Sequence, residues 1–152
     1  MNQIAALLQA DRIVLDLDVA SKARLFEAMG RLFERDAGLV GSTVSASLAA
    51  REKLGSTGLG QGIAIPHGRI RGLTQAIGGF ARLAHGIDFD SPDGKPVTQV
   101  FVLLVPEHAT DQHLQLLSEL AQMFSERGFR ERLASAQDAA ALAAVFGDWQ
   151  PH

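Results

Sequence analysis

The part of this sequence best suited to chemistry is a glycine-rich stretch that ends in a histidine. Residues 51–69 are REKLGSTGLGQGIAIPHGR, in which Gly58, Gly60 and Gly62 alternate ahead of His67. Glycines at this density let backbone N–H groups approach an anion, in conformations that side chains forbid. The stretch lacks the strand and helix context of a dinucleotide fingerprint and the Gly-Lys-Ser/Thr ending of a P-loop. It therefore indicates either another kind of anion-binding loop or turn formation alone.

The position of His67 favours the anion-binding interpretation. Because Pro66 ends a short apolar run just before it, we expect the imidazole to project from the carboxyl end of the sheet, where open α/β sheets bind ligands. A neutral imidazole, with an ordinary pKa of about 6.5, is a competent nucleophile towards phosphorus near pH 7. Arg51 is suited to hold phosphoryl oxygens. The alternative is a structural histidine that bonds a backbone carbonyl.

His113 is a second candidate. It lies in the first turn of a helix that we expect Thr110 or Asp111 to cap, and the positive end of that helix dipole favours a nearby phosphoryl group. The alternative for His113 is packing beside Leu117. The other histidines, to which we assign no role, are His85, His108 and His152.

A metal or other cofactor is not expected. His108, Asp111 and His113 are not spaced to share one helix face, and the aspartates of residues 88–94 do not keep the register of a calcium loop. Cysteine is absent, which excludes disulfides, thiolate metal sites and cysteine nucleophiles. Glu52 and Lys53 are expected on a solvated helix face.

Length and composition indicate one globular domain over residues 1–152. The 152 residues weigh 16.2 kDa, with 47% hydrophobic and 20% charged residues. The net charge of −3 argues against a nucleic-acid partner. Because we recognise no signal peptide, and the apolar run before Pro106 is too short to span a bilayer, we expect a cytoplasmic protein without membrane insertion.

Helices are predicted from apolar spacing and capping residues. A short helix is expected over residues 4–9, and a longer one from an N-cap at Ser21 to Gly38. Ser42 should cap a third helix that stops at Gly55. The helix after residue 110 should turn Leu117, Leu120, Ala121 and Phe124 to the core, and Ser135 with Asp138 resembles a capping box ahead of a last helix.

Strands are predicted over residues 13–15, 63–65, 76–83 and 97–105. The last is a nearly continuous Val/Phe/Leu run, which suits burial on both faces. Gly78 and Gly79 indicate a bulge or close packing. Strands separated by helices, with one strand buried on both faces, predict a three-layer α/β/α domain with a mixed β-sheet.

These residues also resemble a known family. The runs GSTGLGQGIAIPHGR, FARLAHGIDFDSPDGKPV and VFVLLVPEHATDQHLQLLSELA are similar to the signature of phosphotransferase-system (PTS) EIIA domains of the fructose/mannitol type (EIIA type-2), over roughly residues 4–146. The chain most resembles the nitrogen-related branch, because Gln61 stands where sugar-specific members often have glutamate. The resemblance implies the EIIA type-2 fold.

The resemblance also implies a function as a phosphotransferase component. His67 would accept a phosphoryl group from an HPr/NPr-type histidine phosphocarrier, which enzyme I charges from phosphoenolpyruvate. His113 would support the active ring or its phosphoryl group, Arg51 would stabilise the phosphoryl group, and Thr57 and Gly58 would belong to the surrounding loop. The output would be regulation of partner proteins, which in related proteins include potassium-transport components and sensor kinases.

Two alternatives stay open. The chain could be a sugar-specific EIIA that passes its phosphate to an EIIB component. It could also be a binding module in which His67 is structural.

Overall fold

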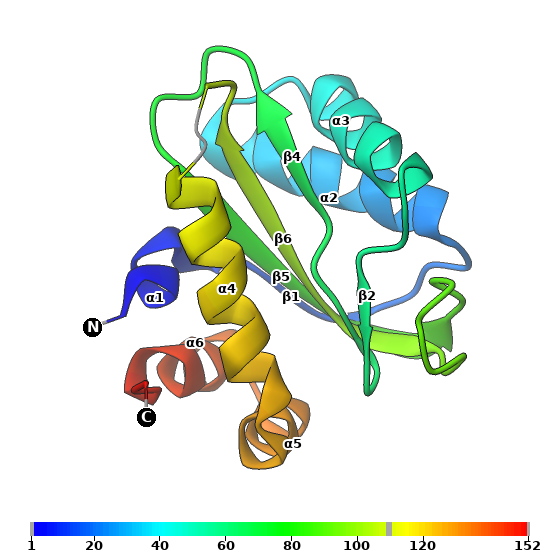
Figure 1. The fold of residues 1–152 in the computed structure, drawn as a ribbon, viewed down its shortest axis with the longest axis vertical. Coiled ribbons are helices and arrows are strands. Elements are labelled where there is room, and N and C mark those ends of the chain that lie inside the picture. Colours follow the sequence, from blue (N-terminus) through cyan, green and yellow to red (C-terminus); the bar gives the residue numbers. More distant parts are fainter. Residues whose placement is uncertain (1, 109–110, 152) are drawn as a thin grey trace.

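The computed structural model describes residues 2–108 and 111–151. Its helices are α1 (Gln3–Leu7), α2 (Lys22–Ala37), α3 (Gly41–Lys53), α4 (Asp111–Ser125), α5 (Arg127–Ser135) and α6 (Ala139–Asp148). Its strands are β1 (Leu8–Leu17), β2 (Gly58–Gly60), β3 (Ile63–Ala64), β4 (His67–Ile70), β5 (Ile77–Ile87) and β6 (Val97–Pro106) (Figure 1). Among the described helices, none has the length and apolar character that a membrane crossing requires.

The strands form one mixed sheet in the order β1-β5-β6-β3-β2. β5 pairs antiparallel with β6, whereas β1 pairs parallel with β5. On its other side β6 is parallel first to β3 and then to β4, which pairs with the later part of β6. β3 and β4 are therefore two successive segments along the same neighbour, interrupted at Ile65 and Pro66.

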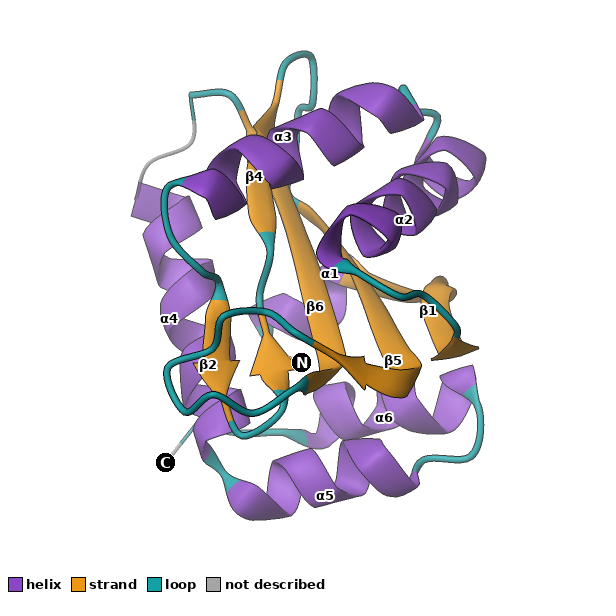
Figure 2. Cartoon of the chain, turned by 90° about the vertical axis from the view of Figure 1, so that its right-hand side faces the viewer, coloured by secondary structure: helices purple, strands orange, loops and turns teal. Residues whose placement is uncertain are grey.

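Helices cover both faces of the sheet, which confirms the predicted α/β/α architecture (Figure 2). Successive side chains of a strand point to opposite faces, so Phe101, Leu103 and Val105 of β6 pack in the core beneath α4, α5 and α6. Val100, Val102 and Leu104 pack in the core beneath α2 and α3. The continuous apolar run of β6 follows from this burial on two sides.

The glycine pair in β5 permits close packing, one of the two predicted alternatives. β5 keeps an unbroken register with β6 from Ile77 to Arg82. A Cβ atom at Gly78 would lie 2.7 Å from the ring of Phe101, and one at Gly79 would lie 2.9 Å from the ring of Phe33. Two phenylalanine rings thus occupy the space above and below these glycines.

Local capping signals were correct for α2 and wrong for α3. The Ser21 side chain accepts a hydrogen bond from the Arg24 N–H, and Gly38 ends α2 with a left-handed φ of 70°. In α3 the N-cap is Val40, not Ser42, and the Glu34 carboxylate accepts the hydrogen bond of the Gly41 N–H at 3.1 Å. A side chain from the preceding helix thus takes the place of a local cap.

Three elements were not predicted from the sequence, namely α5, β2 and β4. Ser135 is the last residue of α5, and Asp138 alone caps α6 by accepting from the Ala141 N–H, so the expected capping box is wrong. The predicted cap at Thr110 lies outside the described residues. β2 and β4 have three and four residues, too short for an alternation pattern to reveal them.

Candidate active site

His67 is the first residue of β4, and its position corrects the sequence prediction. It pairs with Leu103, partway along β6, instead of projecting from the carboxyl end of the sheet. Pro66 interrupts the ladder because it has no N–H, but its carbonyl accepts the hydrogen bond of the Leu103 N–H at 3.0 Å. The chain therefore continues along β6, and the half-buried imidazole stands at the break between β3 and β4.

One tautomer of His67 is selected by its hydrogen bonds. Nδ1 lies 2.9 Å from the Ile65 carbonyl oxygen, which can only accept, so Nδ1 carries the proton. Nε2 is then the unprotonated nitrogen, and it accepts a hydrogen bond from Arg51 Nε at 3.2 Å. The lone pair of Nε2 is the nucleophilic pair of electrons in this arrangement.

The surroundings keep both histidines neutral at pH 7. Burial lowers the pKa of His67, the Ile65 carbonyl raises it, and the positive charge of Arg51 lowers it, with a net result below the ordinary value. The pKa of His113 is also lowered, chiefly by burial and then by His67, Arg69 and Arg51.

Arg51 reaches His67 because α3 packs directly on β4. Gly68 follows His67, and a Cβ atom there would collide with the side chain of Ser47 in α3. Ser47 Oγ donates to the Arg69 carbonyl at 3.1 Å, which fastens the helix to the strand. Arg51 Nη1 in turn donates to the Gly55 carbonyl at 2.9 Å, so the guanidinium is held at both Nε and Nη1.

His113 lies in the first turn of α4 and contacts His67 of β4 with its ring. Its ring centroid is 5.2 Å from that of His67, with an angle of 68° between the rings. His113 Nε2 is buried and has no hydrogen-bond partner among the described residues. The arrangement leaves this nitrogen free to bond a group that enters beside His67.

The glycines predicted to form one loop are divided between two places. Gly60 and Ile63 are paired residues of β2 and β3, so Gln61 and Gly62 form the two-residue turn between them. Both turn residues have positive φ, 58° and 81°, which is typical of tight hairpins and explains Gly62. Gly60 and Gly62 do not line the cavity that holds His67, whereas Thr57 and Gly58 do.

The buried carboxylate of Glu52, which the sequence prediction missed, binds Thr57 in the loop. The Glu52 side chain is only 7% exposed, not solvated as expected, and it forms an ion pair of 2.9 Å with Lys22. Its Oε1 accepts from Thr57 Oγ1 at 2.6 Å, and both carboxylate oxygens lie 3.2 Å from the Thr57 N–H. No local signal distinguishes Glu52 from its exposed neighbour Lys53, because its partners lie in α2 and in the loop.

The open cavity at His67 has a volume of about 330 Å³. Its lining comes from α3, the loop, the β3–β4 break and α4, and consists of Arg51, Ser56, Thr57, Gly58, Leu59, Ile65, His67, Leu117, Ser118 and Ala121. The sequence prediction assigned Leu117 and Ala121 to the core. Ala121 is instead exposed and Leu117 half-buried, while the core contacts of α4 come from Leu116, Leu120, Met123 and Phe124.

Within residues 2–108 and 111–151, no three His, Cys, Asp or Glu side chains gather as metal ligands would. Arg51 and His67 line the cavity, and the His113 ring lies against that of His67 without being part of the lining. A neutral imidazole nitrogen lies beside a fixed guanidinium and a second, unpartnered imidazole. This set can attack a phosphoryl group and bind its oxygens.

Comparisons with known proteins agree with this chemistry. Residues 6–148 match the family model described as "Phosphoenolpyruvate-dependent sugar phosphotransferase system, EIIA 2". A "Nitrogen regulatory protein" of Pseudomonas aeruginosa is 42% identical over 151 residues, which cover 99% of this chain and 98% of that protein.

Solved structures share the fold. The structure of nitrogen regulatory protein IIA-Ntr from Neisseria meningitidis superposes with a TM-score of 0.89 and 51% identity, over 95% of this chain and 99% of that one. The IIA mannitol protein of Escherichia coli gives a TM-score of 0.75 at 21% identity, over 90% of this chain and 96% of that one, and this likeness supports the fold alone.

Proposed function

Since this chain belongs to the phosphoenolpyruvate-dependent sugar phosphotransferase system EIIA 2 family, we propose that it is a phosphoryl carrier that accepts its phosphoryl group on Nε2 of His67. The donor is a histidine phosphocarrier protein of the HPr/NPr type, charged by enzyme I from phosphoenolpyruvate. The output is binding to partner proteins that depends on whether His67 carries phosphate.

The observation that carries this proposal is the fixed tautomer of His67. The Ile65 carbonyl holds the proton on Nδ1, so Nε2 carries the lone pair of the ring, which accepts from Arg51 until a phosphoryl group takes its place. His67 also lines an open cavity, which a histidine with a purely structural role does not require. Its Nε2 is accompanied by Arg51 and by the unpartnered Nε2 of His113.

The transfer step balances without any further reactant. Arg51 releases Nε2 as the donor arrives. The Nε2 lone pair forms a bond to phosphorus while the N–P bond of the donor histidine breaks, and the electron pair of that bond returns to the donor ring. Nδ1 keeps its proton, and the Ile65 carbonyl stabilises the positive charge that develops on the imidazole. Arg51 and His113 then bind the oxygens of the transferred group. The Thr57 donors and the Gly58 N–H already bond Glu52 and Ser56, so Thr57 and Gly58 shape the cavity wall instead.

A protein donor suits the surroundings of the site. Leu59 lines the cavity and is 44% exposed. Exposed apolar side chains near a reactive group favour contact with another protein. Phosphorylation adds about −1.5 to −2 charges, which is enough to change the partners that this face accepts.

A regulatory output is favoured over sugar transport by the nitrogen regulatory proteins among the most similar relatives. The rival function is transfer of the phosphate to a sugar-specific EIIB component. The two are separated by incubating the phosphorylated protein with a fructose-type EIIB. Phosphate retained on this chain supports regulation, and rapid transfer to EIIB supports transport.

The test of the phosphoryl carrier is intact-mass spectrometry at alkaline pH after incubation with phosphoenolpyruvate, enzyme I and an HPr-type carrier. Wild type should gain one phosphoryl group, and His67→Ala should gain none while its circular dichroism spectrum stays unchanged. His85→Ala, an exposed histidine outside the site, is the matched control and should be labelled fully. Labelling of His67→Ala would remove His67 as the acceptor, and no labelling of the wild type would remove the carrier function.

A further inference from the structure

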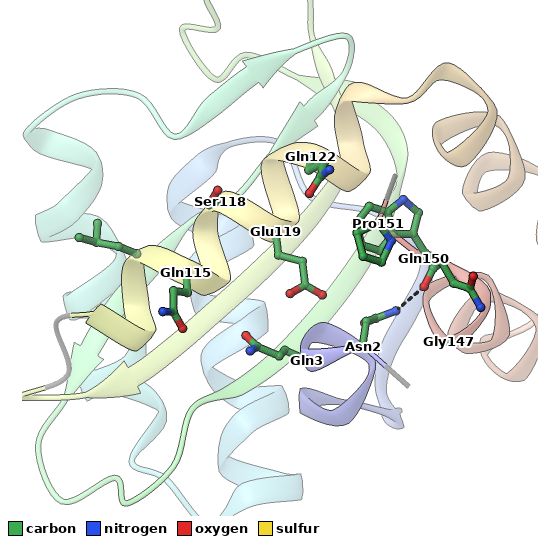
Figure 3. Close-up of a pocket in the computed structure, with 11 residues that line it drawn as sticks. Asn2, Gln3, Gln115, Ser118, Glu119, Gln122, Gly147, Gln150 and Pro151 are labelled. Carbon is green, nitrogen blue, oxygen red and sulfur yellow. Dashed lines mark hydrogen bonds between the residues drawn. The ribbon is translucent and has the colours of Figure 1, made fainter.

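A second and larger cavity, of about 750 Å³, lies between α4 and the two ends of the described chain. Figure 3 shows Glu119 extending from α4 into this space, with Gln3 facing it from α1. Ser118 lines both this cavity and the one at His67, so a molecule bound here would lie across α4 from the phosphoryl acceptor. The volume lies within the range that small-molecule sites occupy.

The walls of the cavity are fixed by contacts between distant parts of the chain. The Asn2 side-chain amide donates to the Phe146 carbonyl at 2.7 Å and to the Trp149 carbonyl at 3.0 Å, which joins the start of α1 to the end of α6. Trp149 is 6% exposed, and its Nε1 donates to Glu126 at 3.0 Å. The cavity is therefore built by ordered residues before any ligand enters.

Glu119 is the feature that indicates a ligand. Its Oε1 is buried and has no hydrogen-bond partner among the described residues. A carboxylate oxygen removed from water without a donor is unfavourable, so it requires a donor from elsewhere. Within residues 2–108 and 111–151, the residues that line the cavity include no lysine, arginine or histidine, and Glu119 is the only acidic one among them.

The other residues that line the cavity indicate which kind of ligand could donate to Glu119. The side-chain amides of Gln3, Gln115 and Gln122 offer carbonyl oxygens around Glu119, and Leu114 and Trp149 offer apolar surface. An ammonium group has three donors and a positive charge, which match one carboxylate and neighbouring amide oxygens. Among the described residues, no three His, Cys, Asp or Glu side chains gather as the ligands of a metal ion would.

We propose that this cavity binds a small organic cation with a primary ammonium group, which pairs with the Glu119 carboxylate. The methylene portion of such a ligand lies against Leu114 and Trp149, and its polar end bonds the glutamine amides. This site is independent of the phosphoryl acceptor.

The test uses 4-amino-1-butanol as the probe and 1,4-butanediol as its uncharged counterpart, at constant ionic strength. Trp149 is the sole tryptophan and the chain has no tyrosine, so its fluorescence reports directly on the cavity. We expect a saturable change with the amine alone. Shifts of the Gln3, Gln115 and Gln122 side-chain amides in ¹H–¹⁵N spectra of the wild type should locate the binding.

Glu119→Gln keeps the shape of the side chain and removes its charge, so it should weaken the binding of 4-amino-1-butanol by at least about tenfold. Glu27→Gln makes the same charge change on α2, on the other face of the sheet, and should bind as the wild type does. The proposal would be overturned if the wild type bound 1,4-butanediol as tightly as 4-amino-1-butanol, or if Glu119→Gln bound the amine as tightly as the wild type. It would also be overturned if KCl or MgCl₂ gave the same response as the amine, or if the amine gave no saturable response. None of these measurements depends on phosphoryl transfer, so the two proposals fail separately.

Discussion

At the scale of single residues, the reactivity of His67 is set by its two hydrogen-bond partners. The Ile65 carbonyl fixes the proton on Nδ1, and Arg51 donates to Nε2. Burial and the charge of Arg51 both disfavour the imidazolium and lower the pKa of His67. The ring therefore takes up a proton at a lower pH than an ordinary histidine does. The arginine proposed to bind the phosphoryl group therefore also disfavours protonation of the proposed nucleophile.

Arg51→Met should raise the pKa of His67, because removal of a positive neighbour makes the imidazolium less unfavourable. In the wild type, the phosphorylation rate should fall to half of its plateau only below about pH 6.5, because the pKa of His67 lies below its ordinary value. In the variant the decline should begin at higher pH. NMR titration of His67 and the pH profile of phosphorylation provide the two measurements.

Arg31→Met, on the exposed surface of α2, is the matched control and should leave the pKa of His67 unchanged. A pKa of His67 that falls or stays constant in Arg51→Met would contradict this account of the site.

Glu52→Gln should destabilise the protein by about 1–3 kcal/mol, because Lys22 loses its buried anionic partner and Thr57 loses a charged acceptor. Phosphorylation should also slow, since Thr57 and Gly58 line the cavity. Urea unfolding and the rate of phosphorylation are the measurements. Lys53→Gln, at the exposed next position, should change neither, and a Glu52→Gln variant as stable as the wild type would show that this network has no energetic role.

At the scale of elements, α4 contributes side chains both to the hydrophobic core and to the wall of the cavity at His67. One side of the helix packs Leu116 and Leu120 into the core, and another presents His113 and Leu117 towards His67. Apolar residues occur on both sides, so periodicity alone could not decide which of them is buried. The adjacent leucines 116 and 117 therefore have different roles despite their identical chemistry.

Leu116→Ala should lower the free energy of unfolding by about 2–5 kcal/mol, as expected for a leucine that is 1% exposed. Leu117→Ala should cost less, since Leu117 is half-buried at the cavity wall. Chemical denaturation of the two variants under the same conditions gives the comparison. If Leu117→Ala lowered the free energy of unfolding more than Leu116→Ala does, the orientation of α4 described above would be wrong.

At the scale of the whole molecule, the mixed sheet brings α3 and α4 to opposite sides of one strand break. β3 and β4 both pair with β6, and α3 and α4 lie on either side of these strands (Figure 1). The half-buried His67 follows the interruption at Ile65 and Pro66. The apolar side chains of Leu59 and Leu114 are exposed on this molecule. The whole arrangement suits a partner protein that must reach His67 across a broad surface.

Leu59→Ser should raise the KM for the phosphorylated carrier about fivefold, corresponding to the loss of about 1 kcal/mol of contact with the donor protein, and should leave kcat nearly unchanged. Steady-state phosphorylation at varied carrier concentration measures both constants. Val40→Ser removes an apolar side chain of 61% exposure next to the start of α3 and should have no effect. An unchanged KM for Leu59→Ser would exclude Leu59 from the docking surface.

The sequence by itself determined the features that depend on near neighbours along the chain. The cap at Ser21, the left-handed Gly38 and the twofold burial of β6 were all predicted, because each follows from local hydrogen bonding or side-chain alternation. The family was identified in the same way, from the motif around His67 and from the run that contains His113. The role of these residues in phosphoryl transfer stays a prediction.

Only the tertiary structure decided which residues meet. It separated Thr57 and Gly58 at the cavity from Gly62 in the hairpin turn, and it buried Glu52 beside Lys22, thirty positions away in sequence. It also showed that β4 continues along β6 after Pro66. The physical reason is that these contacts join segments distant in the chain, and their geometry depends on how helices and strands pack and not on the residue types near each position.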